Sequence, residues 1–320
     1  MSNAILINSS ENRFRVKNLI PVLLFAAMAV TFYILKPGYL NAINIKSILI
    51  QTSFLGIISL GLTLVMMTGG VDMSNGYTAG LGAIAGMWFV MNNGMPLGVG
   101  ILVAIGFVLL IGAINGICVS RLGIAPFVAT LGTMYLCMGL QNWLDDGGQQ
   151  ISYGFPKTYI FLGQGSIWII PMPLLIFVIV FIVLYILTEA CPMGRYLRGS
   201  GLNQFASKLS GINVSFYVFI SYVLSALLSG VLGYILGASQ KYISSGLGSS
   251  YQMDSLLTVL LGKTLTNGKI SVWSTAFGAL FLCAFQNGLS MLGMPVTTLA
   301  ISKGVLLIGL LLFSRYRKIA

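Results

Sequence analysis

The sequence predicts an all-α protein that crosses a membrane many times. Of its 320 residues, 57% are hydrophobic and only 7% are charged, whereas a soluble domain carries about 25% charged residues. The uncharged run 73–120 is far longer than the roughly 20 residues that one helix needs to cross a bilayer. Because the apolar runs are continuous rather than alternating, they favour helices over the strands of a barrel.

The first five spans are predicted from apolar runs and the turn residues between them. Pro37-Gly38 follows the first run, the glycine-rich stretch 69–76 interrupts the next, and Arg121 follows the fourth. The third run is short and rich in glycine, so it forms either a full span or a broken or re-entrant one. The expected ranges are 19–35, 47–68, 77–90, 97–120 and 124–144.

Five more spans follow in the second half and bring the expected number to about ten. A long loop at 145–168 precedes them, and the basic, glycine-rich segment 194–214 separates the first two. The third of these runs, 251–262, is again short, so it forms either a full span or a broken or re-entrant one. The expected ranges are 169–187, 216–238, 251–262, 272–292 and 297–314.

The charge distribution predicts which ends of these spans face the cytoplasm. The chain has 17 Lys and Arg against six acids, for a net charge of +11. With ten spans, the basic groups at 13–17, 121, 195–208, 263–269 and 315–318 fall on one side, and Asp145 and Asp146 on the other. Cytoplasmic loops carry the excess of Lys and Arg. We therefore expect a cytoplasmic tail at 1–18, a transmembrane domain at 19–320 and both termini in the cytoplasm, with no cleaved leader.

The sequence contains no candidate residues for catalysis or for metal binding. It contains no His, and its four Cys are scattered without metal-ligand spacing. Gly262-Lys263-Thr264 is similar to the end of a phosphate-binding P-loop, but Leu257 stands where that motif needs glycine. We expect no catalytic residue, no metal ligand and no cofactor bound by this chain.

Several motifs occur along the chain in a recognisable order. They are Gly69-Gly70-Val71-Asp72-Met73-Ser74-Asn75-Gly76, Asn115-Gly116, Pro126-Phe127-Val128-Ala129-Thr130-Leu131-Gly132, the 194–214 segment with its Ser210-Gly211-Ile212-Asn213-Val214 close, and Asn287-Gly288-Leu289. This order resembles the ribose-type, or monosaccharide, permeases of binding-protein-dependent ABC importers, from about Leu19 to the end. Lys263 and Lys269-Ile270 depart from the glycines that this family has there.

The resemblance implies a permease subunit in a bacterial inner membrane that imports a monosaccharide by alternating access. It also implies a separate cytoplasmic ATPase that uses the ATP, an extracytoplasmic substrate-binding protein and a second permease subunit, either identical or different. One alternative is a non-transporting membrane scaffold or receptor, and the other is a secondary transporter of a small polar solute driven by an ion gradient. That alternative needs ion-handling groups in the spans, where acids are few and His is absent.

The segment 194–214 resembles the family's cytoplasmic coupling loop. Asn203 is suited to begin a short helix there, Phe205 and Leu209 lie four residues apart on one face, and Gly211 is suited to end it. The helix is either a docking element for the ATPase or part of an ordinary connecting loop. The expected coupling residues are Gly194, Arg195, Gly201, Asn203, Phe205, Ala206, Leu209, Ser210 and Gly211.

Hydroxyl and amide side chains within or beside the spans are candidates for the solute pathway. Asp72 is the only acid between Glu11 and Asp145, and a charge at membrane depth costs about 2.5–3.5 kcal/mol. Asp72 therefore either caps the third span at an interface or has a paired or functional role. The candidates are Asp72, Ser74, Asn75, Asn115, Thr130 and Asn287.

Three other charges have expected partners. Asp254 and Lys303 either pair with each other or lie at loop level, and Glu189 pairs with a nearby Arg or with a partner protein.

A short stretch in the first half of the chain is similar in sequence to one in the second half. The motif Asn115-Gly116 is similar to Asn287-Gly288, and each is followed by Gly, Pro, Thr and Leu in the same order. The first copy falls at a cytoplasmic end and the second at an outer end. An inverted repeat explains this similarity, and chance is the alternative. Glycines within the runs are expected to permit close helix packing.

Overall fold

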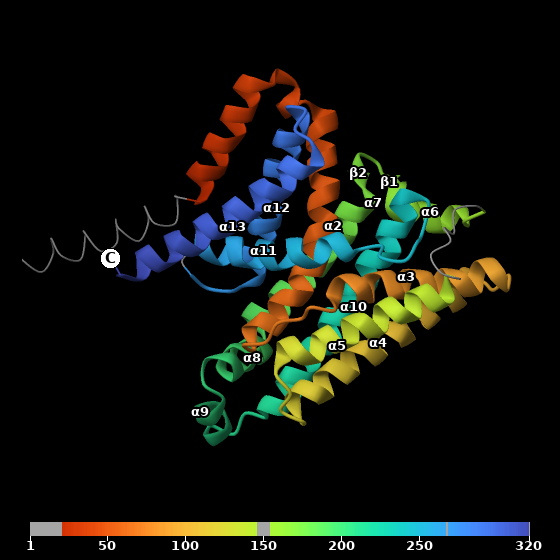
Figure 1. Cartoon of the computed structure of the whole chain (residues 1–320), viewed down its shortest axis with the longest axis vertical. Coiled ribbons are helices and arrows are strands. Elements are labelled where there is room, and N and C mark those ends of the chain that lie inside the picture. Colours follow the sequence, from red (N-terminus) through yellow and green to blue (C-terminus); the bar gives the residue numbers. More distant parts are fainter. Residues whose placement is uncertain (1–20, 146–153, 267, 320) are drawn as a thin grey trace, which may run out of the picture.

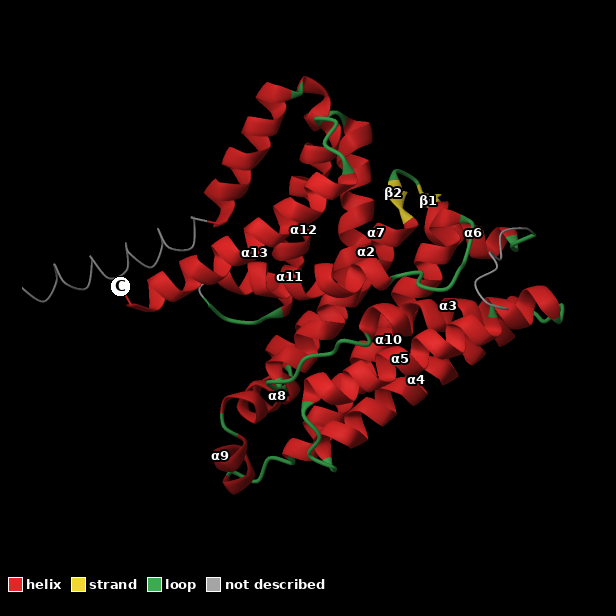
Figure 2. Cartoon of the chain, in the orientation of Figure 1, coloured by secondary structure: helices red, strands yellow, loops and turns green. Residues whose placement is uncertain are grey.

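The computed structural model describes residues 21–145, 154–266 and 268–319, so the expected tail at 1–18 lies outside the described residues. Helices make up nearly all of this part (Figure 2). The first half contains a helix at Pro21–Leu35, η1 (Pro37–Leu40), α2 (Ala42–Met67), α3 (Asn75–Asn92), α4 (Leu97–Ser120), α5 (Pro126–Leu144) and α6 (Lys157–Gln164). The second half contains β1 (Ser166–Ile167), β2 (Ile170–Pro171), α7 (Met172–Tyr185), η2 (Ile186–Ala190), α8 (Pro192–Leu202), α9 (Gln204–Leu209), α10 (Val214–Gln240), α11 (Ser249–Leu265), α12 (Val272–Met291) and α13 (Val296–Ile319).

Every predicted span coincides with a helix, although several boundaries differ. Helix α4 has the predicted bounds. Helices α3 and α11 are 18 and 17 residues long, both longer than predicted. The prediction excluded the polar residues at their starts. In the structure α3 begins at Asn75, which neighbouring helices bury, and α11 begins at Ser249, which is half-buried.

Two predicted loops contain regular structure that the sequence analysis missed. Helix α6 and strand β1 lie in the loop predicted at 145–168, and β1 pairs antiparallel with β2 just after it. Helix α8 covers the start of the 194–214 segment, where the only predicted helix began at Asn203. Glycine and serine lower the helix propensity there. The helix is nevertheless favoured by Pro192 at its first turn and by packing against η2 and α10.

Helices α2 and α10 form the centre of the molecule and pack against each other (Figure 1). Helix α10 also packs against α3 and α4, while α2 packs against α11 and α12. Over the most apolar 18 residues of each helix, 83% of α2 is buried, but only 28% of α4 and 22% of the continuous helix Met172–Ala190. The latter two therefore present broad apolar faces to their surroundings, as lipid-facing helices do.

Within the described residues, five helices are long and apolar enough to cross a membrane: α2, α4, Met172–Ala190, α10 and α12. Shorter apolar helices are Pro21–Leu35 and the Val296–Gly309 part of α13. The chain is therefore an all-α membrane protein with many spans. The number ten stays a prediction.

Close helix packing depends on several of the predicted glycines. A Cβ atom added at Gly233 on α10 would lie 1.9 Å from the carbonyl oxygen of Ala79 on α3. A Cβ atom at Gly262 on α11 would lie 2.1 Å from the carbonyl oxygen of Ser274 on α12. Gly262 is thus a packing residue of a helix pair rather than part of a phosphate loop. Gly106 has no neighbour within 4 Å and does not share this role.

Candidate functional site

The break between α2 and α3 holds a buried carboxylate. The chain leaves α2 through Gly69, whose φ of +83° suits glycine. Asp72 follows and is 3% exposed. Its Oδ1 accepts hydrogen bonds from the Ser74 amide at 2.9 Å and from the Ser74 hydroxyl at 2.7 Å, and its Oδ2 accepts one from the Ser225 hydroxyl of α10 at 2.9 Å. The carboxylate thus joins the start of α3 to α10.

A chain of hydrogen bonds extends from this carboxylate to α4 and α5. The Asn115 amide nitrogen donates to the Ser74 hydroxyl oxygen at 2.9 Å, and the Thr133 hydroxyl donates to the Asn115 amide oxygen at 2.7 Å. The Thr130 hydroxyl donates instead to the Pro126 carbonyl oxygen within α5. The network therefore connects α3, α4, α5 and α10 through uncharged groups around a single carboxylate.

The remaining pathway candidates bond elsewhere. Asn75 donates to the Ser255 hydroxyl of α11 at 2.9 Å. Asn287 accepts a hydrogen bond from Asn44 at 2.9 Å, where α12 meets the start of α2. The structure thus brings Asp72, Ser74, Asn75 and Asn115 together around the start of α3, whereas the side chains of Thr130 and Asn287 bond outside this group.

Sequence reasoning missed two members of this network, Ser225 and Thr133. One signal for Ser225 was present, because Ser221, Ser225 and Ser229 recur at every fourth residue of α10 and so share one helix face. All three are fully buried. Such a polar stripe within an apolar helix indicates a buried partner.

The network suits hydrogen bonding to a neutral polar solute. Hydroxyl and amide groups both donate and accept. In the part of the chain that the structure describes, no group of three or more His, Cys, Asp or Glu side chains is placed to hold a metal ion. Asp72 already has hydroxyl and amide donors on both oxygens.

The 194–214 segment forms two helices at one end of the molecule, remote from α6 and the β1–β2 hairpin (Figure 1). A Cβ atom at Gly194 would lie 1.8 Å from the Thr188 carbonyl oxygen, so only glycine fits where α8 meets η2. Arg195 is exposed on α8. Arg198 forms an ion pair with Glu189, which confirms the expected local Arg partner.

Helix α9 has the features that the sequence predicted. The Asn203 side chain accepts a hydrogen bond from the Ala206 amide at 3.0 Å and caps the helix. Gly211, with a φ of +78°, follows its end. Phe205 and Leu209 are 73% and 76% exposed. Ala206 and Ser210 are exposed as well. Helix α9 therefore presents an uncovered apolar face to its surroundings.

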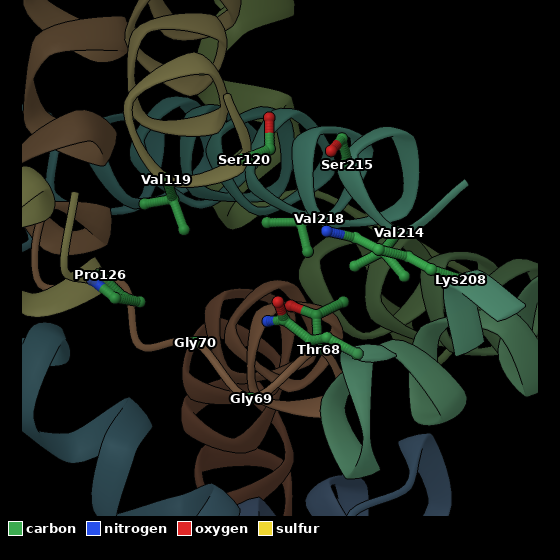
Figure 3. Close-up of a pocket in the computed structure, with 11 residues that line it drawn as sticks. Thr68, Gly69, Gly70, Val119, Ser120, Pro126, Lys208, Val214, Ser215 and Val218 are labelled. Atoms are coloured by element: carbon green, nitrogen blue, oxygen red, sulfur yellow. The ribbon is translucent and has the colours of Figure 1, made fainter. Parts of the chain in front are cut away.

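Helices α8 and α9 lie directly against the break that carries Asp72. A Cβ atom at Gly201 would lie 2.2 Å from the Met67 carbonyl oxygen at the end of α2. Beside this contact is a cavity of about 100 Å³. Its lining residues come from the α2 end, α4, α5, α9 and α10, and the Lys208 amine of α9 points into it (Figure 3). The exposed helix pair and the buried network are thus structurally adjacent.

Asp254 and Lys303 form the ion pair that was one of their two expected arrangements. The Lys303 amine lies 2.9 and 2.7 Å from the two carboxylate oxygens of Asp254. The pair joins α11 to α13, and the two side chains are 16% and 28% exposed.

An all-α membrane protein with a buried polar break and an exposed helix pair beside it has the architecture of a membrane permease. Residues 44–314 match the family described as the branched-chain amino acid transport system / permease component. The match covers most of the chain, which therefore belongs to this permease family.

Individual relatives agree over nearly the whole length. The chain is 31% identical to the ribose import permease protein RbsC of Bacillus subtilis (strain 168), covering 92% of each chain. It is 33% identical to RbsC of Escherichia coli (strain K12), covering 91% of each. It is 30% identical to the galactofuranose transporter permease protein YtfT of E. coli (strain K12), covering 85% of this chain and 80% of that one. No solved structure gave a significant match.

These findings confirm the resemblance to the ribose-type ABC permeases. The chain is a non-catalytic, multi-pass subunit of a bacterial plasma membrane importer. Such a permease works with an ATPase and a substrate-binding protein.

Proposed function

We propose that this permease forms the membrane pathway for a monosaccharide, either ribose-like or another simple sugar. The observation that carries the proposal is the 31–33% identity, over more than nine-tenths of the chain, to permeases named for ribose. The uncharged hydroxyl and amide groups around Asp72 support it, because a neutral solute with many hydroxyls needs partners of this kind.

The solute path runs past Asp72, Ser74, Asn75, Asn115, Thr130 and Asn287. Asn287 occupies the α12 position equivalent to Asn115 on α4. A second permease subunit, identical or related, completes the path. The binding protein delivers the sugar outside, and only the partner ATPase binds ATP. This chain holds no cofactor.

The proposed topology has ten spans, with both termini and residues 194–214 in the cytoplasm. It is built from two inverted repeats, α2–α5 and α10–α13. In support, α2 and α10 are 26 and 27 residues long, and α3 and α11 are 18 and 17. Moreover, α10 packs on α3 and α4 as α2 packs on α11 and α12.

Coupling to ATP hydrolysis passes through α8 and α9. The exposed face of Phe205, Ala206 and Leu209 enters a groove on the ATPase, with Asn203 and Gly211 fixing the ends of α9 and Ser210 bonded to its last turn. Gly194 and Gly201 hold α8 against η2 and α2, and Arg195 faces the partner. Closure of the ATPases then moves the break that holds Asp72, which gives alternating access.

The test is uptake of radiolabelled D-ribose and a panel of other monosaccharides by proteoliposomes that contain the permease, its ATPase and its binding protein. We expect uptake that needs ATP and both partners and that continues when ionophores collapse the proton and sodium gradients. Uptake by the permease alone, driven by an ion gradient, would refute the proposal.

A further inference from the structure

Gln252 in the first turn of α11 is a buried amide with unused hydrogen-bonding capacity. The residue is 7% exposed. Its Oε1 has no hydrogen-bond partner among the described residues, and its Nε2 reaches only the sulfur of Met134 on α5, at 3.5 Å. Thioether sulfur is a weak acceptor. Both ends of the amide are therefore poorly satisfied.

Other buried amides near α3 show how unusual this is. Gln141 of α5 is fully buried, yet its Nε2 donates to the Tyr77 carbonyl oxygen at 2.7 Å and its Oε1 accepts from the Gly246 amide at 2.9 Å. Asn75 likewise bonds to Ser255. Buried polar groups are normally paired. The Gln252 amide oxygen therefore differs from these neighbouring amides, because it accepts no hydrogen bond from the described residues.

The position of Gln252 places it beside the proposed pathway. Helices α3 and α11 begin next to each other, since a Cβ atom at Gly76 would lie 2.9 Å from the Gln252 Cβ and 2.7 Å from the Gly248 carbonyl oxygen. Neither helix start has a side-chain cap. Gln252 thus lies against the first turn of α3, next to the Asp72 network.

A flexible side chain covers the amide. Met134 is half-buried on α5, one turn beyond Thr130, and the neighbouring α5 residues Tyr135 and Leu136 are 66% and 44% exposed. Methionine has three rotatable side-chain bonds and fills irregular spaces. A change of its rotamer would remove the Met134 sulfur from the Gln252 amide nitrogen.

We propose that Gln252 is a solute-binding residue for a neutral, polyhydroxylated solute. A solute hydroxyl donates to its Oε1, a second solute oxygen accepts from its Nε2, and Met134 moves aside. The amide carries no charge, so it suits a sugar and not an ion. This inference rests on the proposed sugar transport.

The test compares wild type with Gln252→Leu in proteoliposomes containing the full importer. Uptake of D-ribose and of each singly deoxygenated ribose is measured with the binding protein saturated by each sugar, so that its own affinity does not contribute. We expect wild type to import ribose about tenfold faster than at least one deoxy analogue, as expected for one lost hydrogen bond. Gln252→Leu should move both sugars at the slower rate.

Two further variants keep the test decisive if Gln252→Leu folds poorly. Gln252→Asn keeps the amide on a shorter side chain and should retain part of the preference for ribose. Gln51→Leu on α2, where an exposed amide bonds to Ser47, is the matched control and should behave as wild type. An unchanged ribose preference in Gln252→Leu overturns the inference while sugar transport stands. If the wild type imports no sugar, both the role of Gln252 and the proposed sugar transport are overturned.

Discussion

At the scale of single residues, the molecule depends on a few polar side chains placed inside an apolar fold. Asp72 has three hydrogen-bond donors from two residues, and these donors join α3 to α10. A buried carboxylate persists only where such donors surround it. The sequence identified Asp72 because it is an isolated acid. It did not identify Ser225, because a serine in an apolar helix is common and only the fold shows what it faces.

We expect Asp72→Ala to destabilise the protein by about 3 kcal/mol, because the Ser74 and Ser225 hydroxyls lose their acceptor inside the molecule. Ser225→Ala removes one donor of several and should cost about 1 kcal/mol. Thermal unfolding of the purified protein in detergent measures both changes. Equal stability of Asp72→Ala and wild type would show that the carboxylate does not hold the break together.

At the scale of elements, the sequence predicted long apolar helices well and polar ones poorly. Both ends of α4 agree with the predicted range 97–120, because a long apolar run with turn residues on each side strongly favours a single membrane helix. Helix α8 was missed because its glycines have low helix propensity and its stability comes from packing on η2 and α10. The cap at Asn203 was predicted, since capping depends on local geometry alone.

Helix α9 provides the clearest prediction for coupling. Ala206 lies between Phe205 and Leu209 in sequence and is exposed, so Ala206→Asp should change the free energy of unfolding by less than about 0.5 kcal/mol. If α9 enters a groove on the ATPase, the buried, unpaired charge prevents docking. We expect normal amounts of protein in the membrane, loss of ATPase copurification and no sugar uptake.

Ala206→Ser, which adds a small uncharged group at the same exposed position, serves as the matched control and should affect copurification less. Normal uptake by Ala206→Asp with the ATPase bound would mean that α9 is only a connector.

The ion pair between α11 and α13 is a second prediction at this scale. Lys303→Met leaves Asp254 unpaired and should cost on the order of 1–2 kcal/mol, below the 3–5 kcal/mol of a fully buried pair, since both side chains are partly exposed. Adding Asp254→Asn should recover most of the loss. Thermal unfolding of the single and double variants measures this coupling. A double variant no more stable than Lys303→Met would show that the pair contributes little.

At the scale of the whole molecule, the proposed inverted repeat relates α4 to α12. The similar motifs Asn115-Gly116 and Asn287-Gly288 lie on these two helices. The partners of the two asparagines differ, because Asn115 bonds to Ser74 and Thr133 whereas Asn287 bonds to Asn44. The short sequence similarity therefore did not predict which side chains the two asparagines contact.

The last prediction concerns the orientation of the molecule in the membrane. With ten spans, residue 153 lies outside the cell, and the segment around residue 200 lies inside. Ser200 itself is fully buried and is a poor labelling site, whereas Leu202 is 87% exposed. Trp168, at the tip of the β1–β2 hairpin, is 95% exposed and probes the same loop as residue 153.

In a variant whose four native cysteines are replaced, cysteines at 153 and 168 should react with an impermeant thiol reagent added to intact cells. A cysteine at 202 should react only after the cells are opened. The basic residues of the 194–214 segment predict this outcome, because moving them across the membrane opposes the charge bias that sets topology. Labelling at 202 in intact cells, with protection at 153 and 168, would invert the molecule and place α9 on the side where no ATPase can reach it.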